Sequence, residues 1–165
     1  MAAGATYVPI ATQTISGTST TNVTFSSITN AYTDLVVIFE GATVAQVNDL
    51  TLQFNSDSGS NYSYTRIVGY GSGQYSDRTS NSTSISITIG SPGTQGHTSI
   101  LHINNYANTN VYKTMLLRTS NTNYGPGAII GLWRNTSAIN AISISISGTT
   151  YSSGSTFTLY GIASA

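Results

Sequence analysis

Charged side chains are scarce in this sequence. Five of the 165 residues are basic and five are acidic, so the formal net charge is zero. Charged residues make up 6% of the chain, whereas a typical globular protein has about 25%. Because binding to nucleic-acid phosphates needs a concentrated basic surface, we expect no nucleic-acid partner.

Cysteine and long apolar runs are also missing. The absence of cysteine excludes disulfide bonds and thiolate metal sites. The longest strongly apolar run is Leu35–Phe39, far short of the roughly 20 residues that a membrane-spanning helix needs. The N-terminus carries neither a basic region nor an apolar core of the kind that a secretory signal has. We therefore expect no membrane partner and no secretory signal.

Hydroxyl side chains supply most of the polarity instead. Serine and threonine together account for 51 residues. Hydroxyls solvate a surface without much electrostatic repulsion between molecules, and a net charge near zero favours association. This composition suits a protein that is held in a large assembly.

Apolar and polar residues alternate with a period of two along much of the chain. Ser84–Ile89 and Ile142–Ser147 each place three isoleucines on one face and three hydroxyls on the other, as half-buried strands require. The pattern predicts an all-β, antiparallel, jelly-roll-like sandwich of about ten strands. The predicted strands are Tyr7–Ile15, Asn22–Ser26, Asp34–Phe39, Leu50–Phe54, Tyr62–Val68, Ser84–Ile89, Ser99–Asn104, Tyr112–Thr119, Ala128–Arg134, Ile139–Ser147 and Thr156–Ile162.

No shift in composition marks a second domain. We expect a single β-sandwich domain over 7–165 and an extended N-terminal arm or first strand over 1–15. The segment 69–82 is glycine-rich and polar and contains Tyr70 and Tyr75. It predicts a long exposed loop, and loops on a rigid scaffold commonly carry partner contacts.

The sequence offers no catalytic constellation. His97 and His102 are the two histidines, and neither has a partner at a recognised catalytic spacing. His102 alternates with Leu101 and Ile103, which predicts a position on the sheet surface, and His97 follows Gly96 in a predicted turn. We therefore expect a protein that is not an enzyme and has no catalytic residues.

Two segments only partly match ligand-binding motifs. Phe54–Asn61 has oxygen-bearing residues at alternate positions, but it lacks the acidic residue that closes a calcium loop. The glycines at 69, 71 and 73 are not followed by the lysine or the helix of a phosphate-binding loop. We interpret both segments as turns or loops and expect no metal and no cofactor.

Tyrosine is the dominant aromatic residue, with eleven copies against four phenylalanines and one tryptophan. Tyrosine is enriched at interfaces because it combines a large contact face with a hydroxyl group. Alternation places Tyr62, Tyr64, Arg66 and Tyr70 on one face of a strand, which is either an interface or a sandwich interior. The candidate contacts with a partner or ligand are Tyr62, Tyr64, Tyr70, Tyr75 and Arg78.

Several segments together resemble a module of tailed-bacteriophage virion proteins. They are Tyr7–Thr12, Val23–Ile28, Tyr32–Val37, Leu52–Ser63, Gly131–Trp133, Ile139–Ile142 and Gly154–Ile162. The resemblance implies a jelly-roll-like, commonly trimeric structural module on the outside of the particle, with no catalytic residues.

This resemblance leads to two hypotheses about function. The sequence shows no fibre shaft, collagen-like or coiled-coil segment, so we expect a capsid decoration (cement) protein that stabilises the head. It would be a homotrimer on the virion exterior, assembled in the host cytoplasm, with the major capsid protein or other virion proteins as partners. The alternative is a tail-fibre or receptor-binding tip that holds host glycan through Tyr70, Tyr75 and Arg78.

Overall fold

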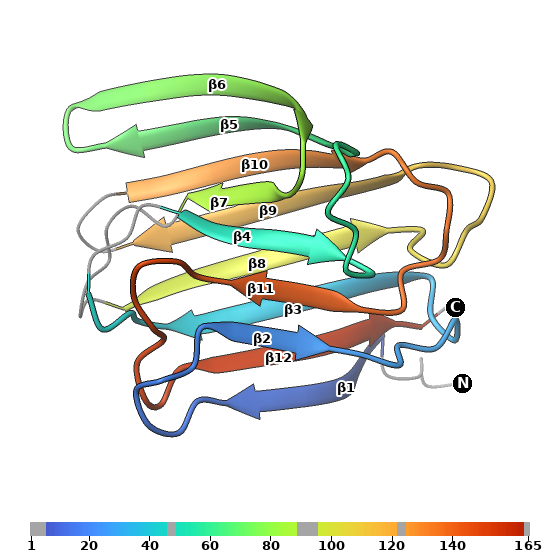
Figure 1. The fold of residues 1–165 in the computed structure, drawn as a ribbon, viewed down its shortest axis with the longest axis horizontal. Helices are drawn as coiled ribbons and strands as arrows, with labels where there is room; N and C mark the ends of the chain where they lie inside the picture. The colour runs from blue at the N-terminus through green and yellow to red at the C-terminus, as the bar shows by residue number, and fades with distance from the viewer. Residues whose placement is uncertain (1–5, 46–48, 89–95, 122–124, 164–165) are drawn as a thin grey trace.

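The computed structural model describes residues 6–45, 49–88, 96–121 and 125–163, and these ranges contain twelve strands and no helix (Figure 1). The strands are β1 (Tyr7–Thr14), β2 (Asn22–Phe25), β3 (Asp34–Gly41), β4 (Asp49–Phe54), β5 (Tyr62–Tyr70), β6 (Gly73–Ser82), β7 (Ile85–Thr88), β8 (His97–Asn104), β9 (Lys113–Asn121), β10 (Gly125–Trp133), β11 (Ile142–Ser145) and β12 (Thr156–Ile162). Each predicted strand overlaps one of them, and β6 is the strand that the sequence did not predict. The expected antiparallel sandwich is confirmed, with twelve strands in place of about ten.

The strands form two antiparallel sheets. The first sheet has eight strands in the order β1-β12-β3-β8-β9-β10-β5-β6, and the second has four in the order β2-β11-β4-β7. The layers β1-β12-β3-β8 and β2-β11-β4-β7 together make an eight-stranded, double-sheet jelly roll. The hairpins β9–β10 and β5–β6 then extend the first sheet beyond β8, so that β5 and β6 lie past β7 in Figure 1.

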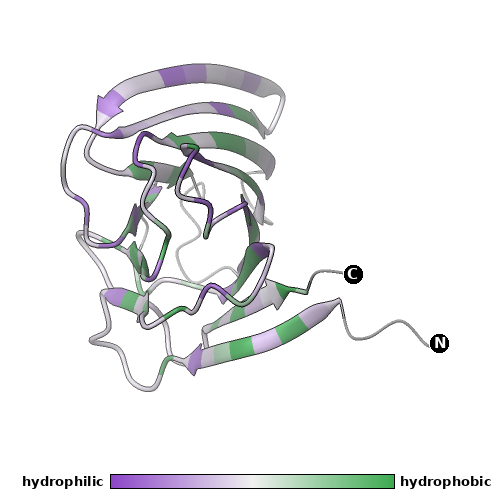
Figure 2. Ribbon diagram, turned by 90° about the vertical axis from the view of Figure 1, so that its right-hand side faces the viewer, coloured by the Kyte–Doolittle hydropathy of each residue, from purple (hydrophilic) through white to green (hydrophobic). Residues whose placement is uncertain are grey.

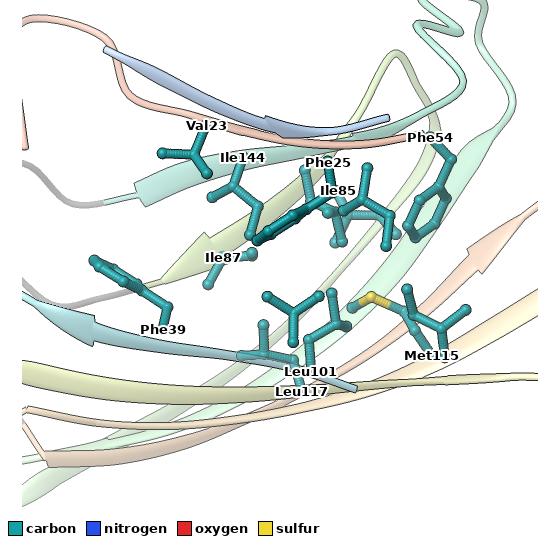
Figure 3. Close-up of a cluster of buried hydrophobic side chains, with 14 of the residues drawn as sticks. Val23, Phe25, Phe39, Phe54, Ile85, Ile87, Leu101, Met115, Leu117 and Ile144 are labelled. Carbon is teal, nitrogen blue, oxygen red and sulfur yellow. The ribbon is translucent and has the colours of Figure 1, made fainter. Parts of the chain in front are cut away.

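The hydrophobic core lies between the two sheets. Figure 3 shows side chains of the second sheet, such as Ile85 and Ile144, facing Leu101 and Leu117 of the first sheet. All four are at least 97% buried. Full burial of a leucine or isoleucine side chain contributes about 1.5–3 kcal/mol, so this layer is the main source of the sandwich's stability.

The segment 69–82 is a hairpin and not the long loop that its glycines predict. Tyr70 pairs with Gly73, so the connection between β5 and β6 is the two-residue turn Gly71–Ser72. Gly71 has a φ of 49°, a left-handed conformation that glycine adopts without steric cost. Strand β6, at the top of Figure 2, has almost no hydrophobic residue on either face. Hydrophobic alternation therefore could not reveal it.

The N-terminal strand belongs to the first sheet. Tyr7–Thr14 pairs antiparallel with β12, with a register shift between Pro9 and Ala11. The Tyr7 ring meets the Tyr160 ring edge to face, with the centroids 6.2 Å apart. The remainder of the expected arm, 1–5, lies outside the described residues.

Candidate functional site

The outward surface of the second sheet consists of polar side chains. Where the side chains are described, its outward positions hold only hydroxyl, amide or carboxylate residues: Asn22, Thr24, Asp49, Thr51, Gln53, Ser86, Ser143 and Ser145. Several of them bond to each other, as Thr24 and Ser143 do with their hydroxyl oxygens 2.8 Å apart. At its described positions this surface presents polar side chains and no large apolar side chain.

The opposite surface, which we name the outer face, is the side of the first sheet that points away from the second sheet. Its centre is apolar: Ile67, Leu116 and Ile130 are 54%, 49% and 51% exposed. These residues lie in continuous cross-strand rows, because Leu116 pairs with Ile130 and also with His102. A second row runs Ile38, Ile100, Arg118, Ala128, Ile67. The two outside surfaces of the sandwich therefore differ strongly in polarity.

The sequence contains a signal for this difference. The strands β7 and β11 alternate strictly between isoleucine and hydroxyl residues, so they have one apolar face. The runs Leu35–Phe39 in β3 and Met115–Leu117 in β9 are continuous, and a strand with a continuous apolar run is apolar on both faces. Sequence reasoning noted the first run only as too short for a membrane span and missed the outer face.

Charges lie at separate places on the outer face. Glu40, at the end of β3, is exposed, and Asp34 accepts from the His102 ring nitrogen, with Asp34 Oδ2 3.0 Å from His102 Nε2. Arg118 projects from β9, and Arg78 projects from β6 at the end of the sheet. The carboxylates are thus on β3 and the guanidinium groups on later strands of the sheet order. A hollow on this face is lined by Tyr7, Val36, Ile100, His102, Leu116 and Arg118.

The inward face of the β5–β6 hairpin carries a different cluster. The Arg66 guanidinium carbon lies 5.5 Å from the Tyr64 ring centroid and 5.9 Å from that of Tyr75. Arg66 also bonds Asp77 on β6 and reaches Asp49 on the second sheet. The hydrogen bond to Asp77 raises the pKa of Arg66, and the same bond lowers the pKa of Asp77. The cluster is therefore an ion-paired link between the two sheets, with the Arg66 guanidinium group bonded to a carboxylate on each.

The predicted contact residues occupy four environments. Tyr62 is fully buried, and its hydroxyl donates to the Phe54 carbonyl at 3.3 Å. Burial raises the pKa of Tyr62 to about 12. Tyr64 and Tyr75 are half-buried beside Arg66, whereas Tyr70 is 41% exposed with its ring centroid 6.1 Å from that of Tyr75. Arg78 alone of the five points to the outer face, so the structure does not bring all five together.

The turn 54–61 is closed by its own hydrogen bonds. Asp57 accepts from the Trp133 indole nitrogen at 2.7 Å, from Asn61 at 2.9 Å and from the Gly59 backbone nitrogen at 2.8 Å. Burial opposes the charge of Asp57, but these hydrogen bonds outweigh it and lower the pKa of the carboxyl group. Among the described residues no group of three or more His, Cys, Asp or Glu side chains could hold a metal ion. The Asp57 oxygens serve to fix the turn against Trp133.

The two histidines differ in environment. His102 lies on the surface of β8, as predicted. His97 is the first residue of β8 and not part of a turn; it is 4% exposed, and its ring centroid lies 4.3 Å from that of Phe39. Burial lowers the pKa of His97 to about 4. His97 is thus a neutral core residue near neutral pH.

Lys113 is a buried residue that the sequence did not single out. It is 1% exposed, and its ammonium group donates to the backbone carbonyls of Asn108, Val111 and Thr136 at 2.6, 2.9 and 3.0 Å. Burial lowers the pKa of this amine. Lys113 ties the β8–β9 connection to the segment after β10, and this role is structural.

Fold and surfaces together define an antiparallel, jelly-roll-like β-sandwich with one apolar outer face. No helix in the described part of the chain is long and apolar enough to cross a membrane. No family model matches the sequence, and no curated protein matches it.

Two solved structures give weak similarity. A protein of unknown function from Shewanella oneidensis MR-1 is 8% identical, with 98% of this chain and 77% of that chain covered and a TM-score of 0.26. The structure of infectious bursal disease virus, Gx strain, is 15% identical, with 93% of this chain and 40% of that chain covered and a TM-score of 0.14. These scores are too low to carry an argument about fold or function, so the functional argument depends on the surfaces.

Proposed function

We propose that this protein is a non-enzymatic structural protein of the virion exterior, a decoration protein that stabilises the capsid of a tailed bacteriophage. The single observation that carries the proposal is the polarity difference between the two outside surfaces. A hydroxyl-covered second sheet suits contact with water, whereas the apolar outer face suits burial in an assembly.

Charge supports the same role. The chain has zero formal net charge, and the outer face mixes few charges of both signs with apolar residues. Little repulsion then opposes close association of many copies on one lattice. Self-association over the outer face is therefore one part of the proposed mechanism.

The edge of the first sheet offers a second means of attachment. Among the described residues β6 pairs with a strand on one side only, which leaves backbone N–H and C=O groups of Gly73–Ser82 on the other side. An extended segment of a major capsid protein can pair with such an edge by strand addition. Strand addition supplies directional hydrogen bonds that the outer face lacks.

Copy number in purified particles tests the proposal. A decoration protein is expected in hundreds of copies per particle, and its removal should lower the temperature at which the head releases DNA. Quantified gel bands of purified virions give the copy number. Tens of copies, located on the tail, would overturn the decoration role.

A tail-fibre or receptor-binding tip is the second candidate, favoured by the tyrosines of the β5–β6 hairpin. Tyr70 and Tyr75 lie next to each other at the free end of the sheet, and Tyr70 is 41% exposed. Aromatic faces of this kind stack on sugar rings. Binding to host cells or to a glycan array that is lost in Tyr75→Ala and kept in Tyr112→Ala, a change at another exposed tyrosine, would support the tip.

A further inference from the structure

We infer that a second copy of this chain covers the outer face, related to the first by a two-fold axis that runs along β8. The inference rests on the proposed self-association and specifies its geometry. It replaces the homotrimer that the resemblance implies with a closed dimer. Three observations lead to it: the apolar side chains of the outer face, the complementary charges on that face and the polar outward side of the second sheet at its described positions.

Part of the apolar surface meets apolar surface under this rotation. An axis along β8 preserves the position along each strand and exchanges the strands on either side, so β9 lies over β3 of the second copy and β10 over β12. Leu116 then lies over β3 of the second copy at the level of Val36, which is itself only 3% exposed, and Ile130 faces Tyr160, because these residues share one cross-strand row with His102. In the second row Ile100 meets its own copy at the axis, whereas Arg118 lies over Ile38. Apolar side chains therefore meet at Ile130 with Tyr160 and at Ile100, across sheets that pack about 10 Å apart.

The charges match as well. Glu40 shares a cross-strand row with Thr98 and Ser120, so Glu40 of the second copy lies above Ser120 on β9. Arg118 is two residues from Ser120 on the same strand and points to the same face. Long side chains span this offset, and the two-fold symmetry forms the Glu40–Arg118 contact twice. Each Glu40 carboxylate thus comes within reach of the Arg118 guanidinium group of the other copy.

The remaining surfaces argue for a two-fold contact. A three-fold ring needs two different complementary patches on each subunit, whereas a two-fold contact uses one self-complementary patch. The outward side of the second sheet is polar at every described position, so it does not complement the apolar rows. The outer face complements itself.

The available area is sufficient. A stable interface of standard size covers about 800 Å² on each partner, which is about a tenth of the 8041 Å² accessible surface of the chain. Eight strands spaced about 4.8 Å apart make a face roughly 34 Å wide. The overlap leaves β6 outside the contact, so Arg78 serves as a control position on the same face.

The first experiment measures the mass of the purified chain by sedimentation equilibrium. The expected mass is twice the 17.3 kDa of the chain. A monomer at about 100 µM, or a mass three times that of the chain, would overturn the inference.

The second experiment exchanges the charges. Glu40→Arg and Arg118→Glu are each expected to weaken the dimer about tenfold or more, because each places two like charges in contact. The double variant is expected to return to within about threefold of the wild-type dissociation constant. Arg78→Glu, the same change outside the overlap, should leave the dimer unchanged. If the double variant dimerises as weakly as the added effects of the two single variants predict, the result would contradict the proposed geometry.

The third experiment removes apolar contact at the centre. Leu116→Asn is expected to raise the dissociation constant about thirtyfold, and Ile130→Asn to act in the same direction. Val111→Asn is the matched control, since Val111 is 46% exposed against 49% for Leu116 but lies outside the first sheet. All three side chains are exposed, so the variants should fold, and circular dichroism checks this. Equal effects at Leu116 and Val111 would contradict the inference.

These results are separable from the proposed function. A charge-exchanged dimer that behaves as expected, in a protein missing from purified particles, would refute decoration and keep the two-fold contact. If purified particles instead carry wild-type and Glu40→Arg protein equally well, each as a monomer, the decoration role is kept and the two-fold contact is refuted.

Discussion

Arg66 on β5 holds Asp77 on β6 by two hydrogen bonds: Arg66 Nε donates to Asp77 Oδ1 at 2.9 Å, and Nη2 donates to Oδ2 at 2.5 Å. The third guanidinium nitrogen donates to Asp49 at 3.1 Å and to Ser86 at 3.0 Å on the second sheet. One side chain therefore links the β5–β6 hairpin to the strands β4 and β7. This link is important because the hairpin lies beyond the last strand of the second sheet.

Replacement of Arg66 by methionine is expected to destabilise the protein. The Arg66 side chain is 14% exposed, but Asp77 and Asp49 are 37% and 38% exposed, so solvent reduces the loss to about 1–3 kcal/mol. Urea unfolding measures the loss, and hydrogen exchange should show it first in β6. Arg78→Met, on the outer face, should cost less than about 0.5 kcal/mol. Equal losses for the two variants would refute the bridging role.

Asp57→Ala tests the turn that precedes β5. The change leaves the Trp133 indole N–H, which is buried, without its acceptor. An unsatisfied buried donor costs about 1–3 kcal/mol, and thermal unfolding should record that loss. Ser58→Ala, at an exposed position of the same turn, is the control. A stable Asp57→Ala variant would show that the turn forms without the carboxylate.

The sequence predicts the strands that have one apolar face better than the others. Alternation in β7 and β11 identifies them directly, because only their inward residues are apolar. Strand β6 is polar on both faces, so its place in the sheet depends on backbone pairing with β5 and on the two-residue turn at Gly71. The glycine-rich sequence of this segment is as compatible with a loop as with a hairpin. The alternation pattern of one strand also does not show which other strand it pairs with.

The candidate site shows a similar limit. Alternation correctly places Tyr62, Tyr64 and Arg66 on one face of β5, but it does not say which sheet that face meets. The answer depends on Asp49 and Ser86, which are distant in sequence and approach Arg66 only in the folded chain. The outer face was open to prediction, because continuous apolar runs require apolar residues on both sides of a strand.

Lys113→Met tests a buried contact that no sequence pattern marks. The ammonium group donates to three backbone carbonyls, and methionine keeps the volume but leaves these acceptors without a donor. We expect a loss of about 2–3 kcal/mol in the free energy of unfolding, measured in urea. Thr114→Ala, a change at the next, exposed residue, should be nearly neutral. A neutral Lys113→Met variant would show that water satisfies the carbonyls.

Acid should destabilise the protein through His97. Burial lowers the pKa of this histidine from 6.5 in the unfolded chain to about 4 in the folded protein, so the unfolded state binds more protons between these two values. Stability is therefore highest above pH 6.5, falls as the pH drops towards 4, and loses at most about 3 kcal/mol from this residue. Urea unfolding at a series of pH values measures the change.

His97→Leu isolates this contribution because leucine keeps an apolar contact with Phe39 and carries no titrating group. The variant is expected to lose less stability between pH 6.5 and 4 than the wild type. Below pH 4 the curves of unfolding free energy against pH should become parallel for the wild type and His97→Leu, since folded and unfolded His97 are then both protonated. An unchanged slope in His97→Leu would assign the acid sensitivity to the carboxylates Asp57 and Asp77, whose pKa values are lowered in the folded state.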